Sequence, residues 1–123
     1  SVLSAAKEEW IIVVGHHPIY SHGLYGNTVV LVKQLAPLLE KYRVSAYLNG
    51  HEHDLQLMKR INSVRYIISG GGGGKRKTVL GPNSEFAASA LGFFRLDFDA
   101  KHLRIFMFGS DGRQMREAID PRR

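Results

Sequence analysis

The amino-acid sequence predicts an α/β fold with a mixed β-sheet and an antiparallel hairpin near its C-terminal end. Short runs of β-branched and aromatic residues bounded by glycine, at residues 10–14 and 44–48, are typical of buried strands. A helical pattern lies between these runs, and the order strand, helix, strand predicts a right-handed crossover between parallel strands. Two alternating apolar segments, 91–98 and 102–108, flank a turn at residues 99–101 and favour the hairpin. The 123 residues fit a single domain.

Two helices are expected in the first third of the chain. Residues 5–9 have the pattern of the last turns of a helix that ends before the first strand. The pair Asn27-Thr28 is a suitable N-cap for the second helix, which should run to about Tyr42 and begin a fresh turn or kink at Pro37. Helical spacing directs one apolar face of this helix toward the sheet: Leu31, Leu35, Leu38, Leu39 and Tyr42.

The second half of the chain is expected to contain mostly strands. Residues 55–61 and 65–68 alternate well enough to be two strands joined by a turn at 62–63. Residues 78–90 are small, polar and irregular, which favours a surface loop. The tail after the hairpin has the pattern of one more short strand ending near Pro121.

Composition excludes several classes of function. The absence of cysteine excludes disulfides, thiolate zinc ribbons and cysteine nucleophiles. No apolar run approaches the roughly 20 residues that span a bilayer, so no membrane partner is expected. The net charge of +6 is concentrated at residues 75–77 and 122–123, which are either solvated surface or a basic rim around a phosphate pocket. Aromatic residues do not interleave with these basic runs, so no nucleic-acid partner is expected.

Two histidine clusters follow the two predicted parallel strands. Residues 15–18 read GHHP, and residues 50–53 read GHEH. The carboxyl ends of neighbouring parallel strands meet at one edge of a sheet, so both clusters should face a common crevice. Imidazole is a good ligand for zinc, iron and manganese, and the sequence therefore predicts a metal site.

Geometry suggests which histidines are ligands. His51 and His53 share one face if the segment is extended, and a tight loop would also let either side chain turn toward a common point. His16 and His17 are adjacent, so their side chains point in opposite directions on an extended backbone and only one should be a direct ligand. Pro18 restricts His17 to an extended conformation, and we expect His17 either to pack or to support a ligand without binding the metal itself.

The remaining polar residues near the clusters leave alternatives open. His22 is either a mobile surface residue or a catalytic one, and His102, within the hairpin, is structural. Glu52 and Asp54 could bind metal or orient a ligand imidazole, but solvation at the surface is favoured for Glu52.

The glycine run at residues 70–74 is not a phosphate-binding P-loop. A GxxxxGK[ST] frame that ends at Lys75 needs glycine at position 69 and serine or threonine at position 76, where the sequence has Ser69 and Arg76. A flexible loop beside a pocket fits the pattern better.

The GHHP and NGHEH segments resemble GHxP and GHxH, the last two metal motifs of the calcineurin-like metallophosphoesterases. Residues 31–39 and 66–70 are similar to the tartrate-resistant type of purple acid phosphatase. The resemblance implies that residues 1–123 are the C-terminal part of such a domain, without its N-terminal metal motifs. It also implies the C-terminal half of an αββα sandwich.

The resemblance implies specific roles for five residues. His16 and His51 would bind one metal ion, and His53 would bind the other; the pair would be iron with zinc, manganese or a second iron. The family contacts substrate phosphate with a histidine in the loop after GHxP. An alignment without gaps places that position at Tyr25, with His22 three residues earlier.

The implied activity is phosphomonoester hydrolysis of the acid phosphatase type, by two-metal in-line attack of a metal-bound hydroxide on a phosphate ester. This chain would supply only part of the site and would need the missing N-terminal half as its partner, so weak metal binding and little catalysis are expected of the chain alone. The alternatives are a phosphodiesterase or nucleotide hydrolase of the same fold, or a catalytically inactive fragment that acts as a binding module. The family is secreted or lysosomal or vacuolar, but no secretion signal is visible in this chain, which leaves the compartment open.

Overall fold

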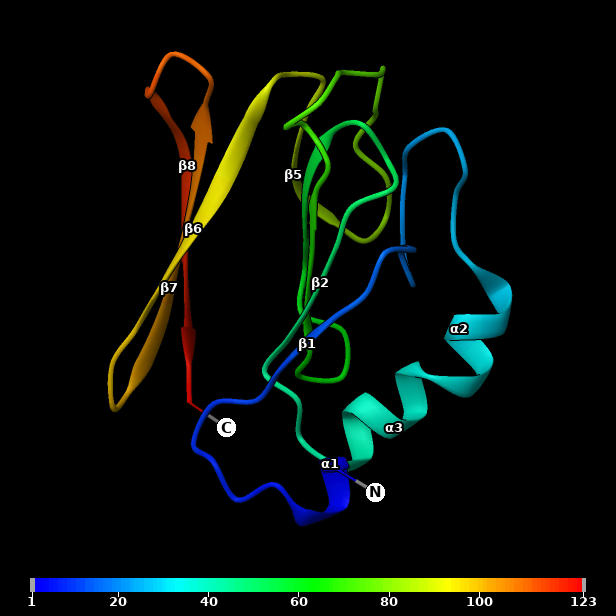
Figure 1. The fold of residues 1–123 in the computed structure, drawn as a ribbon, viewed down its shortest axis with the longest axis vertical. Coiled ribbons are helices and arrows are strands. Elements are labelled where there is room, and N and C mark those ends of the chain that lie inside the picture. Colours follow the sequence, from blue (N-terminus) through cyan, green and yellow to red (C-terminus); the bar gives the residue numbers. More distant parts are fainter. Residues whose placement is uncertain (1, 123) are drawn as a thin grey trace.

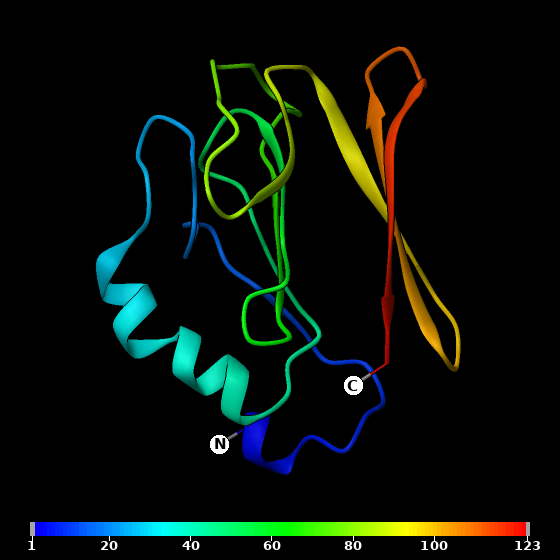
Figure 2. The same ribbon diagram turned by 180° about the vertical axis from the view of Figure 1, so that it is seen from behind.

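A computed structural model describes residues 2–122, which form three layers (Figure 1). Helices cover one face of a five-stranded sheet, and a three-stranded sheet packs on its other face, as the reverse view also shows (Figure 2). The elements are α1 (Val2–Ala5), β1 (Ile12–Val14), α2 (Val29–Gln34), α3 (Ala36–Lys41), β2 (Ala46–Asn49), β3 (Leu55–Met58), β4 (Arg65–Ser69), β5 (Ser84–Ala88), β6 (Gly92–Phe98), β7 (His102–Gly109) and β8 (Gln114–Pro121).

The large sheet is mixed, as the sequence predicts. Its strand order is β1-β2-β4-β3-β5; β1, β2 and β4 run parallel, and β3 runs antiparallel to both of its neighbours. The small sheet is antiparallel with the order β6-β7-β8, which confirms the hairpin and the additional C-terminal strand. None of the helices in residues 2–122 has the length and apolar character needed to cross a bilayer.

A hydrophobic core lies between each pair of adjacent layers. One contains Leu39 of α3 and Tyr66 of β4 and lies between the helices and the large sheet. The other contains Ile67 of β4 and Ile105 of β7 and lies between the two sheets. Tyr66 and Ile67 are neighbours on one strand and therefore point to opposite faces, so the central strands must be apolar on both sides.

The predicted long helix is broken into two. It begins after Thr28, as expected, but the break falls at Leu35 and Pro37 lies in the first turn of α3, where its missing N–H costs nothing. The break changes the phase of the apolar face, so Ala36 is buried while Leu38 is 43% exposed. The expectation that Leu38 faces the sheet is therefore wrong.

Three other expectations need correction. Residues 78–90 are not only a surface loop, because β5 forms within them and pairs with β3. The segment Ser84–Ala88 has no strict apolar alternation, so the sequence pattern does not reveal this strand at the sheet edge. The first helix covers Val2–Ala5 and not residues 5–9, and the first strand is limited to Ile12–Val14.

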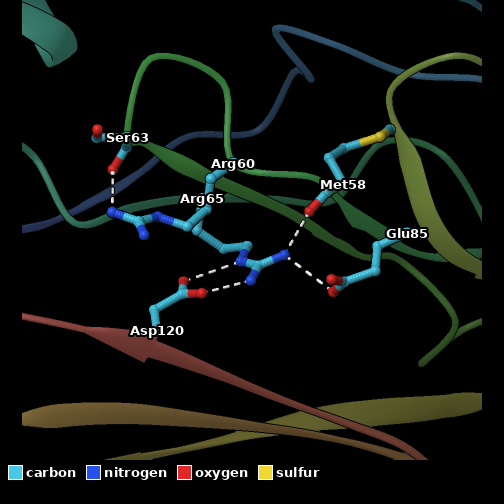
Figure 3. Close-up of polar contacts among 6 residues, drawn as sticks. All are labelled: Met58, Arg60, Ser63, Arg65, Glu85 and Asp120. Carbon is cyan, nitrogen blue, oxygen red and sulfur yellow. Dashed lines mark hydrogen bonds and ion pairs between the residues drawn. The ribbon is translucent and has the colours of Figure 1, made fainter.

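A buried ion pair ties the two sheets together (Figure 3). The Arg65 guanidinium on β4 donates two hydrogen bonds to the Asp120 carboxylate on β8, one of them 2.9 Å long from Nε. It also donates to Glu85 on β5 at 3.0 Å and to the Met58 carbonyl oxygen on β3 at 2.7 Å. Burial alone lowers the pKa of Arg65, but the hydrogen bonds and charges of Asp120 and Glu85 outweigh it and raise that pKa overall.

Removal of the Asp120 carboxylate should strongly destabilise the chain. Asp120→Ala leaves the Arg65 charge buried without its bidentate partner, and the expected loss is about 3–5 kcal/mol of unfolding free energy, measured by urea denaturation. The matched control is Asp97→Ala, because the Arg95–Asp97 pair is exposed and such pairs contribute only about 0–1 kcal/mol. Equal losses in the two variants would contradict the assigned role of Arg65.

Candidate functional site

The loops after β1 and β2 leave the sheet at the same edge. The two strands are parallel and in register, with Val14 opposite Leu48. The Gly15 amide extends this ladder by donating to the Leu48 carbonyl oxygen at 2.9 Å. Residues 15–18 and 50–53 therefore begin side by side, as expected from the strand, helix, strand order.

Tyr47 supports the GHHP turn from below. Its side chain is buried in the core, and its hydroxyl donates to the His17 carbonyl oxygen at 2.8 Å. A β-carbon at Gly15 would lie 2.2 Å from the same hydroxyl oxygen, so no larger residue fits there without moving Tyr47. Burial raises the pKa of Tyr47, which keeps the phenol protonated and able to donate.

The rings of His16, His17 and His51 come together at this edge, with one nitrogen of each within 4.8 Å of the others. His16 Nε2 and His51 Nδ1 are 3.2 Å apart. Two imidazole nitrogens bound at about 2.0–2.1 Å to one tetrahedral ion are about 3.3 Å apart. The 3.2 Å separation therefore suits two ligands of a single metal ion, and it also allows an N–H···N hydrogen bond between the two rings. Sequence analysis gives His17 a packing or supporting role, but the structure brings its ring into this group.

His51 reaches the group through an unusual backbone conformation. Its φ angle is +66°, in the left-handed region, and residues 51–54 form bends instead of an extended segment. His51 and His53 therefore do not share a face. Desolvation lowers the pKa of His51, and the neighbouring His17 and His16 lower it further. A lowered pKa favours the neutral imidazole, which is the form that binds metal.

His53 lies apart from the three-ring group and is exposed. Its backbone carbonyl oxygen accepts a hydrogen bond from the Arg76 amide at 2.5 Å. Its Nδ1 lies 3.4 Å from the point where a β-carbon at Gly74 would sit, so its side chain faces the glycine-rich loop. His53 could therefore serve a second ion, but not the one between His16 and His51.

Tyr25 and Arg76 lie beside His51. The Tyr25 ring packs on the His51 ring, with 4.5 Å between the ring centroids. The Arg76 guanidinium lies over the Tyr25 ring, 5.0 Å from its centroid. Arg76 Nη2 also donates to the His51 carbonyl oxygen at 3.4 Å. In the sequence, Arg76 belongs to the basic run at residues 75–77, which is compatible both with solvated surface and with a basic rim around a phosphate pocket.

His22 points to a different place. Its Nε2 accepts a hydrogen bond from the Asn83 amide at 3.3 Å, which holds the ring against the loop before β5. It lines a cavity of about 360 Å³ with Lys77, Thr78 and Val79. The structure thus places Tyr25 at the histidine group and His22 away from it. His102 lies on β7, in the other sheet.

The two carboxylates of the second cluster turn inward. Glu52 and Asp54 are each 1% exposed, so the expectation that Glu52 is solvated at the surface is wrong. Burial raises the pKa of Asp54, and a hydrogen bond from Gln56 acts in the opposite direction. Among residues 2–122, no carboxylate joins the three-histidine group.

Comparison with protein families and curated proteins places these motifs in context. The calcineurin-like phosphoesterase family model matches residues 2–55. Human tartrate-resistant acid phosphatase type 5 is 36% identical over 98% of this chain, and purple acid phosphatase 3 of Arabidopsis thaliana is 35% identical over 86% of it. The chain spans only 40% and 31% of the length of these two relatives.

Solved structures share the fold. GAP50 of Plasmodium, described as the anchor in the inner membrane complex, superposes with a TM-score of 0.93 at 26% identity, over 98% of this chain and 40% of its own. A purple acid phosphatase from yellow lupin superposes with a TM-score of 0.78 over 95% of this chain and 26% of its own. At 20% identity, the lupin enzyme supports the fold alone.

The histidine geometry predicts a measurable metal affinity. The affinity of this chain for Co²⁺ can be measured by titration followed by visible absorption. His16→Ala or His51→Ala should each weaken binding by more than the ~10–100-fold loss that is typical when a residue that only orients a ligand is removed. His102→Ala is the matched control and should leave the affinity unchanged. Unchanged Co²⁺ affinity in both His16→Ala and His51→Ala would contradict the site.

Proposed function

The chain belongs to the calcineurin-like phosphoesterases and resembles a tartrate-resistant-type purple acid phosphatase, and we propose that it supplies one part of the dinuclear metal site of a phosphomonoester hydrolase. The observation that carries the proposal is the 3.2 Å separation of His16 Nε2 and His51 Nδ1. These nitrogens come from two motifs that lie 35 residues apart, and their separation suits one ion.

The proposed ligand set divides between two ions. His16 and His51 hold one ion, and His53, whose ring faces the glycine-rich loop, holds the other. When bound, such ions would polarise a phosphoryl oxygen and generate a nucleophile from water. Their identity is taken from the family as iron with zinc, manganese or a second iron.

Two residues of this chain are proposed to handle the phosphate ester itself. Tyr25 packs directly on His51 and is therefore preferred over His22 as the residue that contacts phosphate. Arg76, above Tyr25, carries a fixed positive charge that would offset negative charge building on the phosphoryl oxygens.

We infer that a further segment completes the site. The histidine group holds neutral donors only, while hard cations prefer carboxylate oxygens, and Glu52 is buried away from the group. The strand β1 ends the sheet order, so no strand within residues 2–122 pairs with its outer edge, and Val14 there is 73% exposed. We therefore propose that residues 1–123 are the C-terminal part of the domain and that the N-terminal part lies along β1 and brings the missing carboxylates.

A second candidate is a non-catalytic binding module. It is supported by the likeness to GAP50, which is described as an anchor, and by the lack of carboxylates in the histidine group among residues 2–122. A phosphodiesterase or nucleotide hydrolase of the same fold would use the same ligands, so only substrate preference separates it from a monoesterase.

The test compares two substrates in the natural protein that contains this chain. We expect hydrolysis of para-nitrophenyl phosphate to exceed that of the diester bis-para-nitrophenyl phosphate. His51→Ala and His53→Ala should each lower kcat/KM by about 100-fold or more, beyond the effect of losing a mere orienting partner. His102→Ala, in the other sheet, should leave kcat/KM unchanged.

Three results would overturn parts of this proposal. Faster diester hydrolysis would favour the phosphodiesterase, and no hydrolysis of either ester would favour the binding module. Stoichiometric binding of two ions and rapid turnover by residues 1–123 alone would contradict the need for a further segment.

A further inference from the structure

The segment that follows β2 carries both accessible and buried polar side chains. His51 is half-buried and His53 is exposed, whereas Glu52, Asp54 and Gln56 are buried, with Gln56 wholly so. Buried carboxylates and amides are costly unless they form hydrogen bonds. The partners of these inward-facing groups therefore indicate what the segment holds in place.

Glu52 binds the loop that carries Tyr25. One carboxylate oxygen, Oε2, accepts a hydrogen bond from the Ser21 hydroxyl at 2.6 Å and another from the Tyr25 amide at 3.1 Å. Both bonds reach from the metal-binding loop after β2 to the loop after β1. Since the acceptor is a carboxylate, these bonds are stronger than those between neutral groups.

Gln56, at the start of β3, binds the same loop. Its Oε1 accepts from the His22 amide at 3.0 Å, and its Nε2 donates to Asp54 at 2.8 Å and to the Ser21 hydroxyl at 3.4 Å. The side chains of Glu52, Asp54, Gln56 and Ser21 thus form one buried network.

This network replaces secondary structure in residues 21–25. The Ser21 amide donates to Asn27 Oδ1 at 2.9 Å, and the Gly23 amide donates to the Ser21 hydroxyl at 3.0 Å. With the His22 and Tyr25 amides, four of these five backbone N–H groups are bound by side chains. The packing is tight, because a β-carbon at Gly23 would lie 2.5 Å from Glu52 Oε2.

We propose that Glu52 is a positioning residue that holds Tyr25 over His51, and so links the substrate-contacting loop to the metal-binding loop. Gln56 supports the same loop through the His22 amide. Glu52 sits next to His51 in sequence, so one short segment fixes both the ligand and the residue packed on it. The catalytic consequence rests on the proposed role of Tyr25, but the link between Glu52 and the Tyr25–His51 contact does not.

The direct test measures that contact by NMR of protein labelled with ¹³C-histidine. Tyr25→Leu defines the ring-current shift that Tyr25 produces on the His51 ring protons, which lie under a ring 4.5 Å away. Glu52→Ala should abolish this shift, and Glu52→Gln, which keeps an acceptor oxygen, should retain most of it. Glu117→Ala, an exposed glutamate on β8, is the matched control and should retain all of it.

A second variant tests the same link from the other side. Gly23→Ala removes no side chain of the network, but its methyl group would clash with the Glu52 and Asp54 carboxylates and displace them. It should also abolish the shift, so the test stands even if Glu52→Ala does not fold. Retention of the shift in folded Glu52→Ala would overturn the proposal; if Glu52→Ala is unfolded, retention of the shift in Gly23→Ala would overturn it.

Kinetics in the natural protein separate positioning from general stability. Glu52→Ala should lower kcat/KM for para-nitrophenyl phosphate by about 10–100-fold, with Co²⁺ affinity nearly unchanged and partial rescue by Glu52→Gln. In a double-mutant cycle, adding Glu52→Ala to Tyr25→Leu should cost little more, because both changes remove one function. Fully additive losses would contradict the link. Absence of hydrolysis in the unaltered protein would instead refute the proposed function, and the NMR result would still decide the role of Glu52.

Discussion

Parallel pairing of β1 with β2 determines where every candidate ligand lies. The register that places Val14 opposite Leu48 continues to Gly15, so the GHHP and GHEH segments leave the sheet together. Parallel strands need a crossover, and α2 and α3 supply it while covering the first hydrophobic core. On the other face of the sheet, Leu48 of β2 packs against the second core, which lies between the two sheets. Loops at the carboxyl ends of a rigid sheet are where α/β folds build sites.

The sequence predicts this convergence but not the details that aim the side chains. Parallel pairing of the strands at residues 10–14 and 44–48 follows from the strand, helix, strand order, so the meeting of His16 with His51 is predictable. The left-handed backbone at His51 is not, because only the full loop determines it. The inward turn of Glu52 is equally hidden, since a carboxylate between two histidines has the same sequence pattern whether it faces water or Ser21. Leu38 shows a third case, in which a helix break shifts a face by one position.

Two buried polar systems divide the work of holding the fold and the site. Arg65 joins three strands of the large sheet and the last strand of the small sheet, far from the histidines along β4. The Glu52 network joins the loops after β1 and β2 to the start of β3, where Gln56 lies. A buried charge that loses its partner is costly in either system, yet the consequences differ in location. Change at Arg65 acts on the packing of sheet against sheet, whereas change at Glu52 acts on the loop that packs over His51.

The charge balance of the site also follows from where its acids are used. One oxygen of the Glu52 carboxylate accepts hydrogen bonds from the Ser21 hydroxyl and the Tyr25 amide, and one oxygen of the Asp54 carboxylate accepts from Gln56. Neither acid joins the histidine group. Arg76 adds positive charge beside His51, whose pKa desolvation and the neighbouring histidines lower. Divalent or trivalent ions placed there would lack a counter-charge within residues 2–122. The acids nearest the histidines instead hold the loop beside them, and this supports the proposal that a further segment supplies the carboxylates of the site.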